Sequence, residues 1–189
     1  MYTAVGKFIL DLSTNGSTNA IRGGATREYI HMRSFDFIFL LHLMQKTMGI
    51  TNMLCKALQE KPQDIINAMS LVSTIKTLLE KFRAEGWDDF VTEVLSFFTK
   101  QDILMPDLSL PYTIGSGISC SQRDDVTLEH HYHFDVFVKV IKYQVKELKI
   151  RFNDETIELL TLTSALDPHN HFKSFDIDKI CHLAETLYP

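Results

Sequence analysis

The feature that most constrains the fold is a run of apolar residues at helical spacing between positions 134 and 152. Its members follow one another at steps of three or four residues: Phe134, Phe137, Ile141, Val145, Leu148 and Phe152. Such steps place all the side chains on one face of an α-helix. A second run has the same spacing and comprises Ile65, Met69, Val72, Ile75, Leu79 and Phe82. Because a helix with one apolar face must bury it against another element, the sequence predicts an all-α fold.

Helix-ending and helix-starting residues divide this fold into a bundle of amphipathic helices. Ser34 is suited to cap a helix that ends at Gly49, and Thr51 is suited to cap a short helix after it. Gly86 separates the helix of the second apolar run from a helix that begins near Trp87. Further helices are predicted over 128–152, 154–166 and 175–187, the last capped by Ser174. Short connections between the helices favour antiparallel neighbours.

Composition divides the chain into a predicted tail, a helical domain and a loop. Residues 13–28 are rich in Ser, Thr, Asn and Gly, so residues 1–33 are predicted to be a poorly ordered N-terminal segment. The helical domain is predicted over 34–189. Within it, the Pro-, Gly- and Ser-containing stretch at about 102–128 is predicted to be one long, irregular, flexible loop.

Charge and cysteine content narrow the classes of function. The 189-residue chain has a net charge of −5 and a pI of about 5.9, whereas a stand-alone nucleic-acid-binding protein is usually basic. Three widely spaced cysteines form no disulfide framework, which predicts a reducing compartment and a protein that is not secreted. The most apolar stretch, FDFIFLLHLM at 35–44, is about half the ~20 residues that span a bilayer, so no membrane partner is predicted.

No catalytic residue, metal site, cofactor or small-molecule substrate is predicted from the residue patterns. Histidines cluster in HHYH at 130–133 and HNH at 169–171. Their spacing matches no standard zinc template, and surface or core histidines are the favoured interpretation. The carboxylates form no pair with the spacing of a shared site.

Two features are candidates for contact with DNA. One is a row of lysines at steps of three, four and three: Lys139, Lys142, Lys146 and Lys149. Such a row could follow a phosphate backbone, although a solvated face of an amphipathic helix is the favoured alternative. The other is Trp87, the only tryptophan. Its ring could stack on a base, but packing between helices is the favoured alternative.

Long stretches of the chain resemble one known family. They are SFDFIFLLHLMQKTMGITNMLCKALQEKPQDIINAMSLV, LLEKFRAEGWDDFVTEVLSFFTKQDILMPDL, LEHHYHFDVF and ELKIRFNDETIELLTLTSALDPHNHFKSFDIDKICHLAETLYP. These stretches resemble the hAT-type transposase-derived proteins, in particular the zinc finger MYM-type protein 1-like group. The resemblance covers roughly residues 34–189.

The resemblance implies that this chain corresponds to one part of a larger enzyme. In that family a helical insertion interrupts a ribonuclease-H-like core, whose Asp-Asp-Glu carboxylates hold two divalent ions for DNA cleavage. The chain resembles the insertion, and the family's catalytic carboxylates fall outside it. The expectation is therefore a truncated transposase-derived helical domain without enzymatic activity of its own. Its expected location is the nucleus by resemblance, or otherwise the cytoplasm.

The alternative is a domesticated module that associates with DNA or with other proteins. Self-association through an exposed helical face is also expected, because an insertion separated from its core exposes apolar surface.

Overall fold

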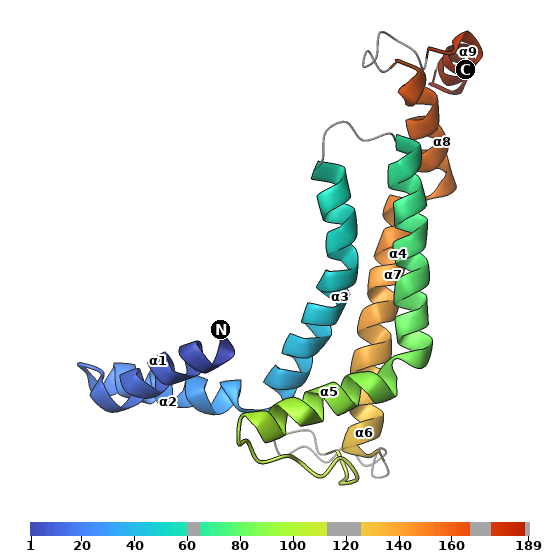
Figure 1. The fold of residues 1–189 in the computed structure, drawn as a ribbon. Coiled ribbons are helices and arrows are strands. Elements are labelled where there is room, and N and C mark those ends of the chain that lie inside the picture. Colours follow the sequence, from blue (N-terminus) through green and yellow to red (C-terminus); the bar gives the residue numbers. More distant parts are fainter. Residues whose placement is uncertain (60–64, 113–125, 167–174, 188–189) are drawn as a thin grey trace. The chain divides into compact units, whose positions relative to one another are not determined.

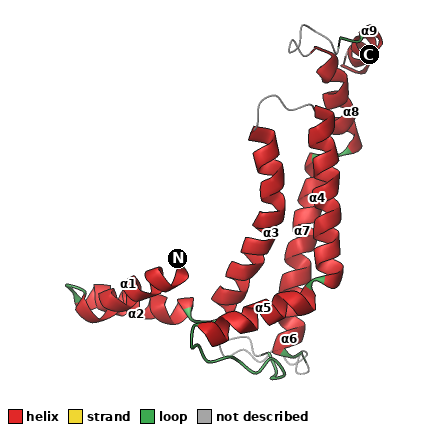
Figure 2. Ribbon diagram, viewed as in Figure 1, coloured by secondary structure: helices red, strands yellow, loops and turns green. Residues whose placement is uncertain are grey.

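The computed structural model describes residues 1–59, 65–112, 126–166 and 175–187, and all the regular structure in these ranges is helical (Figures 1 and 2). The all-α prediction is thus confirmed. The α-helices are α1 (Tyr2–Asn15), α2 (Asn19–Met32), α3 (Phe35–Gln59), α4 (Ile65–Glu85), α5 (Trp87–Lys100), α6 (Leu128–His130), α7 (Lys139–Arg151), α8 (Asp154–Thr163) and α9 (Ile177–Leu187). A π-helix, η1 (His131–Val138), joins α6 to α7, and a 3₁₀ turn, η2 (Ser164–Leu166), follows α8.

The chain divides into two compact units, each built from two separate segments. Unit 1 contains residues 1–46 and 85–137, and unit 2 contains 47–84 and 138–189. The expected boundary between a tail and a domain at residue 33 does not coincide with this division.

Residues 1–33, which are predicted to be poorly ordered, contain two helices, α1 and α2, that fill most of this segment and pack against each other (Figure 1). Only the turn between them is irregular. The side-chain oxygen of Thr18 accepts a hydrogen bond from the Ile21 N–H at 3.2 Å and caps α2. Gly23 and Gly24 lie inside α2, where each costs about 1 kcal/mol relative to alanine. The packing of α1 against α2 offsets the cost of these two glycines, which the composition of α2 alone does not offset.

Helix α3 is continuous from Phe35 to Gln59, so the predicted end at Gly49 is wrong. The start was predicted correctly, since the Ser34 hydroxyl accepts a hydrogen bond from the Phe37 N–H at 3.3 Å. The Thr51 hydroxyl does not cap a new helix. It donates to the carbonyl oxygens of Thr47 and Met48, both at 3.2 Å, as threonines inside helices do.

The core of unit 1 is aromatic. The rings of Phe39 and Phe90 meet edge to face at 5.2 Å, and those of Phe90 and Phe137 lie 5.3 Å apart. Such pairs contribute beyond the area they bury. Fully buried side chains of α3, α5 and η1 make up this core: Ile38, Phe39, Leu43, Phe90, Val94, Phe98 and Phe137.

The core of unit 2 is aliphatic and includes residues of the two predicted apolar runs. The buried members are Val72, Ile75 and Leu79 of α4 and Ile141 and Val145 of α7. The Lys76 ammonium donates to the carbonyl oxygen of Phe152 at 3.0 Å and ties α4 to the end of α7. The side chains of Ile65 and Met69 lie outside the described residues.

The predicted single α-helix over 128–152 contains a π-helical segment. Tyr132 and Phe137, five residues apart, are both buried, whereas Phe134 is 48% exposed. A π-helix has i→i+5 hydrogen bonds, so residues five apart return to the same face. Tyr132 therefore belongs to the buried apolar face of η1. The prediction that Phe134 lies in the core is wrong.

Other boundaries agree with local signals. Gly86 separates α4 from α5 as predicted. The Asn153 carboxamide oxygen accepts from the Thr156 N–H at 2.7 Å and caps α8. The carboxylate of Asp176 accepts from the N–H groups of Asp178 and Lys179 and caps α9. The predicted cap Ser174 lies outside the described residues, as does the Lys61–Pro62 junction.

Residues 103–112 form no helix, in keeping with the predicted irregular loop, and most of the remainder of 102–128 lies outside the described residues. Among the helices that the structure describes, none combines the length and apolar character that crossing a bilayer requires.

Candidate nucleic-acid interface

A groove with basic walls runs between α4 and α7 of unit 2, which lie side by side (Figure 1). It has a volume of about 540 Å³. Helix α4 contributes Arg83, and α7 contributes Lys142, Lys146 and Lys149. Val145 and Ile150 supply apolar surface to the lining. None of the described residues that line the groove is acidic.

The periodicity of α7 explains why the lysines gather here. Its apolar face, with Ile141 and Val145, is buried in unit 2. Lys142 and Lys146 are four residues apart and therefore lie one above the other on a neighbouring, exposed face. Their aliphatic stems can lie along apolar surface while the ammonium groups stay in water.

One lysine of the row is already partly neutralised within the chain. The Lys149 ammonium lies 2.8 Å from Oε1 of Glu80, and both side chains are exposed. This hydrogen bond and the positive charge of Lys149 hold the pKa of Glu80 below its usual value, and Arg83 and Lys76 add to the effect. Glu80 is thus surrounded by cations from both helices.

The other groove cations keep their charge available. Within the described part of the chain, Lys142 and Lys146 have no ion-pair partner, and Glu147 pairs with Arg151 at 3.7 Å. The groove therefore presents the positive charges of Arg83, Lys142 and Lys146 to solvent, despite the net negative charge of the chain. Clustered cations of this kind attract polyanions at short range.

The structure thus brings together three of the four predicted lysines and places the fourth apart from the groove. Lys139 begins α7, is exposed and does not line the groove.

Trp87 is not positioned to stack on a base of DNA, because it is buried in unit 1. Only 8% of it is exposed. Its ring stacks on His133 with centroids 4.2 Å apart and planes 9° apart, and it meets Phe137 edge to face at 5.4 Å. Burial lowers the pKa of His133, which favours a neutral imidazole in this stack. The geometry supports packing between helices over stacking on a base.

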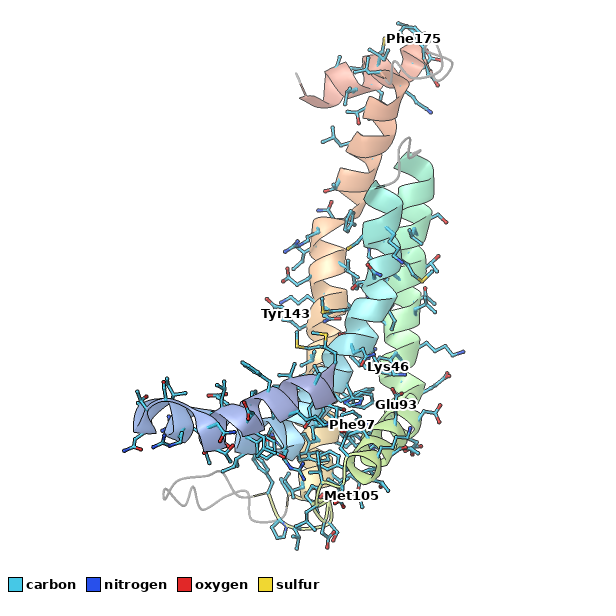
Figure 3. The ribbon with its side chains drawn as sticks, turned by 60° about the vertical axis from the view of Figure 1, so that its left-hand side comes forward. Lys46, Glu93, Phe97, Met105, Tyr143 and Phe175 are labelled. Carbon is cyan, nitrogen blue, oxygen red and sulfur yellow. The ribbon has the colours of Figure 1, made fainter. Side chains whose placement is uncertain are left out.

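Sequence reasoning missed Arg83, which lines the groove, and Tyr143, an exposed residue of α7 outside the groove lining. Arg83 comes from a different helix, so no local spacing connects it with the lysines. Tyr143 could have been found, because it follows Lys139 by four residues and precedes Lys146 by three. It is 63% exposed, and Figure 3 shows it projecting outward from α7. An exposed aromatic ring beside lysines is typical of surfaces that bind nucleic acid.

The histidine cluster of residues 130–133 serves packing. His131 stacks on Tyr112 with centroids 3.7 Å apart and lies 3.3 Å from the Asp135 carboxylate. His130 packs against Phe134. In the part of the chain that the structure describes, no three His, Cys, Asp or Glu side chains form a group that could hold a metal ion. His169 and His171 lie outside that part.

Comparison of this chain with protein-family models, with curated proteins and with solved structures finds no match.

Proposed function

We propose that the chain is a helical module that binds the phosphate backbone of DNA through the groove between α4 and α7. We propose further that it is derived from the helical insertion of a hAT-type transposase, acts in the nucleus and does not cleave DNA by itself. The observation that carries the DNA contact is the convergence of Arg83, Lys142 and Lys146 from two helices on one groove without a lining carboxylate. The transposase origin rests on the sequence resemblance of residues 34–189.

The form of the groove favours backbone contact over reading of base sequence. Lysine ammonium groups are flexible point charges that fit phosphates but fix little geometry. Few groups in the lining could read base edges, so the expected binding is weakly dependent on sequence. Its strength should come from release of counterions, which makes it steeply dependent on salt.

The test is binding of the purified chain to a labelled DNA duplex across a series of salt concentrations. Neutralising about three phosphates predicts a slope of roughly −2 to −3 in a plot of log K against log salt. The variant Lys142→Glu with Lys146→Glu should weaken binding at least ~10-fold and reduce the slope by about 2.

The matched control is Lys56→Glu with Lys81→Glu. Both residues are exposed, lie in unit 2 and do not line the groove. This pair changes the net charge by the same amount. If the two double variants weaken binding equally, general charge rather than the groove is responsible, and the proposal is wrong.

The proposed lack of catalysis has its own measurement. Incubation of the chain with duplex DNA and Mg²⁺ or Mn²⁺ should yield no strand cleavage. Metal-dependent cleavage that co-purifies with the chain would overturn this part of the proposal while leaving the binding result intact.

Exposed apolar surface favours a second candidate function, a module for protein–protein interaction. Leu40, Leu41 and Met44 of α3 are exposed by 43%, 40% and 56%. Binding to a protein partner through such a surface would be nearly independent of salt, which distinguishes it from the groove.

A further inference from the structure

A small cavity in unit 1 lies where α1, the end of α2 and the residue after α5 meet. Its volume is about 160 Å³. The polar residues that line it include Thr3 and Lys7 of α1, Tyr29 of α2, Arg33 directly after α2 and Gln101 directly after α5. No Asp or Glu occurs among the described residues that line it.

Hydrogen bonds from residues distant in sequence hold the walls in place. The Tyr2 hydroxyl donates to the carbonyl oxygen of Met32 at 2.8 Å, and the Tyr2 ring packs edge to face on Phe97. Nη2 of Arg33 donates to the carbonyl oxygen of Asp102 at 2.8 Å. These bonds join α1 to α2, and α2 to the end of α5, so the cavity is built by the packing of unit 1.

The groups that remain available in the cavity are mainly donors. Arg33 makes two of the hydrogen bonds its five N–H groups allow, one to Asp102 and a longer one of 3.4 Å to the Tyr29 oxygen. The Tyr29 hydroxyl therefore keeps its own proton for another acceptor. The Thr3 hydroxyl donates to Oε1 of Gln101, which leaves the amide N–H groups of Gln101 free to donate.

The charged side chains that line the cavity, Lys7 and Arg33, are both cations. Lys7 has no ion-pair partner among the described residues, and Arg33 adds the positive charge of its guanidinium group. Both cations adjoin a space without a lining carboxylate. A ligand that brings negative charge and mainly acceptor atoms would satisfy all of these groups.

The size of the cavity limits the ligand. Ligand pockets for drug-sized molecules measure about 300–1,000 Å³, which exceeds this volume. The space is large enough to hold several water molecules. A tetrahedral oxyanion with part of its hydration fits such a space, and a nucleotide does not.

We propose that this cavity is a binding site for a small tetrahedral oxyanion, inorganic phosphate being the leading candidate. Lys7 and Arg33 balance the charge of the anion, and Tyr29 and Gln101 donate to its oxygens. The site lies in unit 1 and does not rest on the proposed DNA contact of unit 2.

The test is calorimetric titration of the full chain with inorganic phosphate at constant ionic strength. Lys7→Gln should weaken binding about 10-fold, the effect of one charge-assisted hydrogen bond. Tyr29→Phe should weaken it about 3- to 5-fold, because it removes the hydroxyl and keeps the ring against Arg33. Lys100→Gln is the matched control, since Lys100 is exposed, lies in unit 1 and does not line the cavity. This control should bind phosphate as the unaltered chain does.

Amide chemical shifts of the unaltered chain give a second measurement that needs no variant. Addition of phosphate should shift the amides of Thr3, Gly6, Lys7, Arg33 and Gln101. The proposal is overturned if phosphate does not bind, if Lys7→Gln and Lys100→Gln weaken binding equally, or if the shifts centre on Lys142 and Lys146 instead. Only the last outcome would bear on the groove of unit 2, so the two sites are tested separately.

Discussion

At the scale of single residues, the glycines show how one residue type has opposite roles in this chain. Gly49 lies inside α3, and a Cβ atom added there would meet nothing within 4 Å. Gly16 lies between α1 and α2, and a Cβ atom there would sit 2.5 Å from the carbonyl oxygen of Leu12. The first glycine is not required by its surroundings, whereas the second allows a close approach of the backbone.

We expect Gly49→Ala to raise the free energy of unfolding by about 0.5–1 kcal/mol, because alanine restricts the unfolded chain and favours the helix. Gly16→Ala should lower it by at least ~1 kcal/mol, because the added methyl group displaces the turn. Urea unfolding followed by circular dichroism measures both. Destabilisation by Gly49→Ala would show that α3 is interrupted at this residue, as the sequence alone predicts.

At this scale, the role of a residue can be predicted from the sequence when the groups that it contacts lie near it in the chain. Ser34 and Gly86 were placed correctly because each acts on backbone within a few residues of itself. Gly49 was misjudged because its cost of about 1 kcal/mol is small beside the burial of α3 side chains such as Phe39 and Leu43. Tertiary contacts of that kind leave no local signal.

At the scale of elements, the π-helix η1 decides which aromatic residues reach the core of unit 1. Phe137 is fully buried, and Phe134, which the regular helical pattern places on the same face, is 48% exposed. Tyr132 takes the buried position, and its hydroxyl donates to the Asp36 carboxylate. Burial and this hydrogen bond raise the pKa of Tyr132, so the hydroxyl stays protonated.

Alanine substitutions distinguish the π-helical arrangement from a regular one. Phe137→Ala should lower the free energy of unfolding by about 3–5 kcal/mol, since it leaves a cavity in a packed core. Phe134→Ala should cost less than ~1 kcal/mol, since the ring is half exposed. Chemical denaturation provides both values. Equal, large losses would mean that residues 128–152 form one regular α-helix with both rings inside.

For the candidate interface, the sequence predicts only the part that lies within one helix. The lysines of α7 follow from its period, and the structure brings Lys142, Lys146 and Lys149 to one groove. Arg83 joins them from α4, 59 residues before Lys142 in the numbering. Which helix supplies the opposite wall depends on packing, and no spacing rule within one segment gives it.

At the scale of the whole molecule, exposed apolar residues predict self-association. Leu40, Leu41 and Met44 are neighbours on α3, and each of them is at least 40% exposed. Exposed apolar side chains that are neighbours on a helix favour contact between copies of a chain. The expectation of self-association from sequence thus acquires a specific surface.

Met44→Lys should shift the chain toward monomer, because it places a charge in this apolar surface. Ser96→Lys adds the same charge at an exposed residue of α5 in unit 1, away from this surface, and should leave association unchanged. Sedimentation velocity over a range of protein concentrations measures both. A chain that remains monomeric at all concentrations before any substitution would contradict the prediction.

The division into two discontinuous units has a consequence for synthesis on the ribosome. Unit 1 cannot be completed until residue 137 has emerged, although its first segment ends at residue 46. Residues 47–84 emerge before the partner segment 138–189 exists. At a synthesis rate of about 5–20 residues per second, the apolar side chains of residues 47–84 stay without their packing partners for several seconds. During that interval the nascent chain is an expected client of chaperones, whatever the stability of the finished protein.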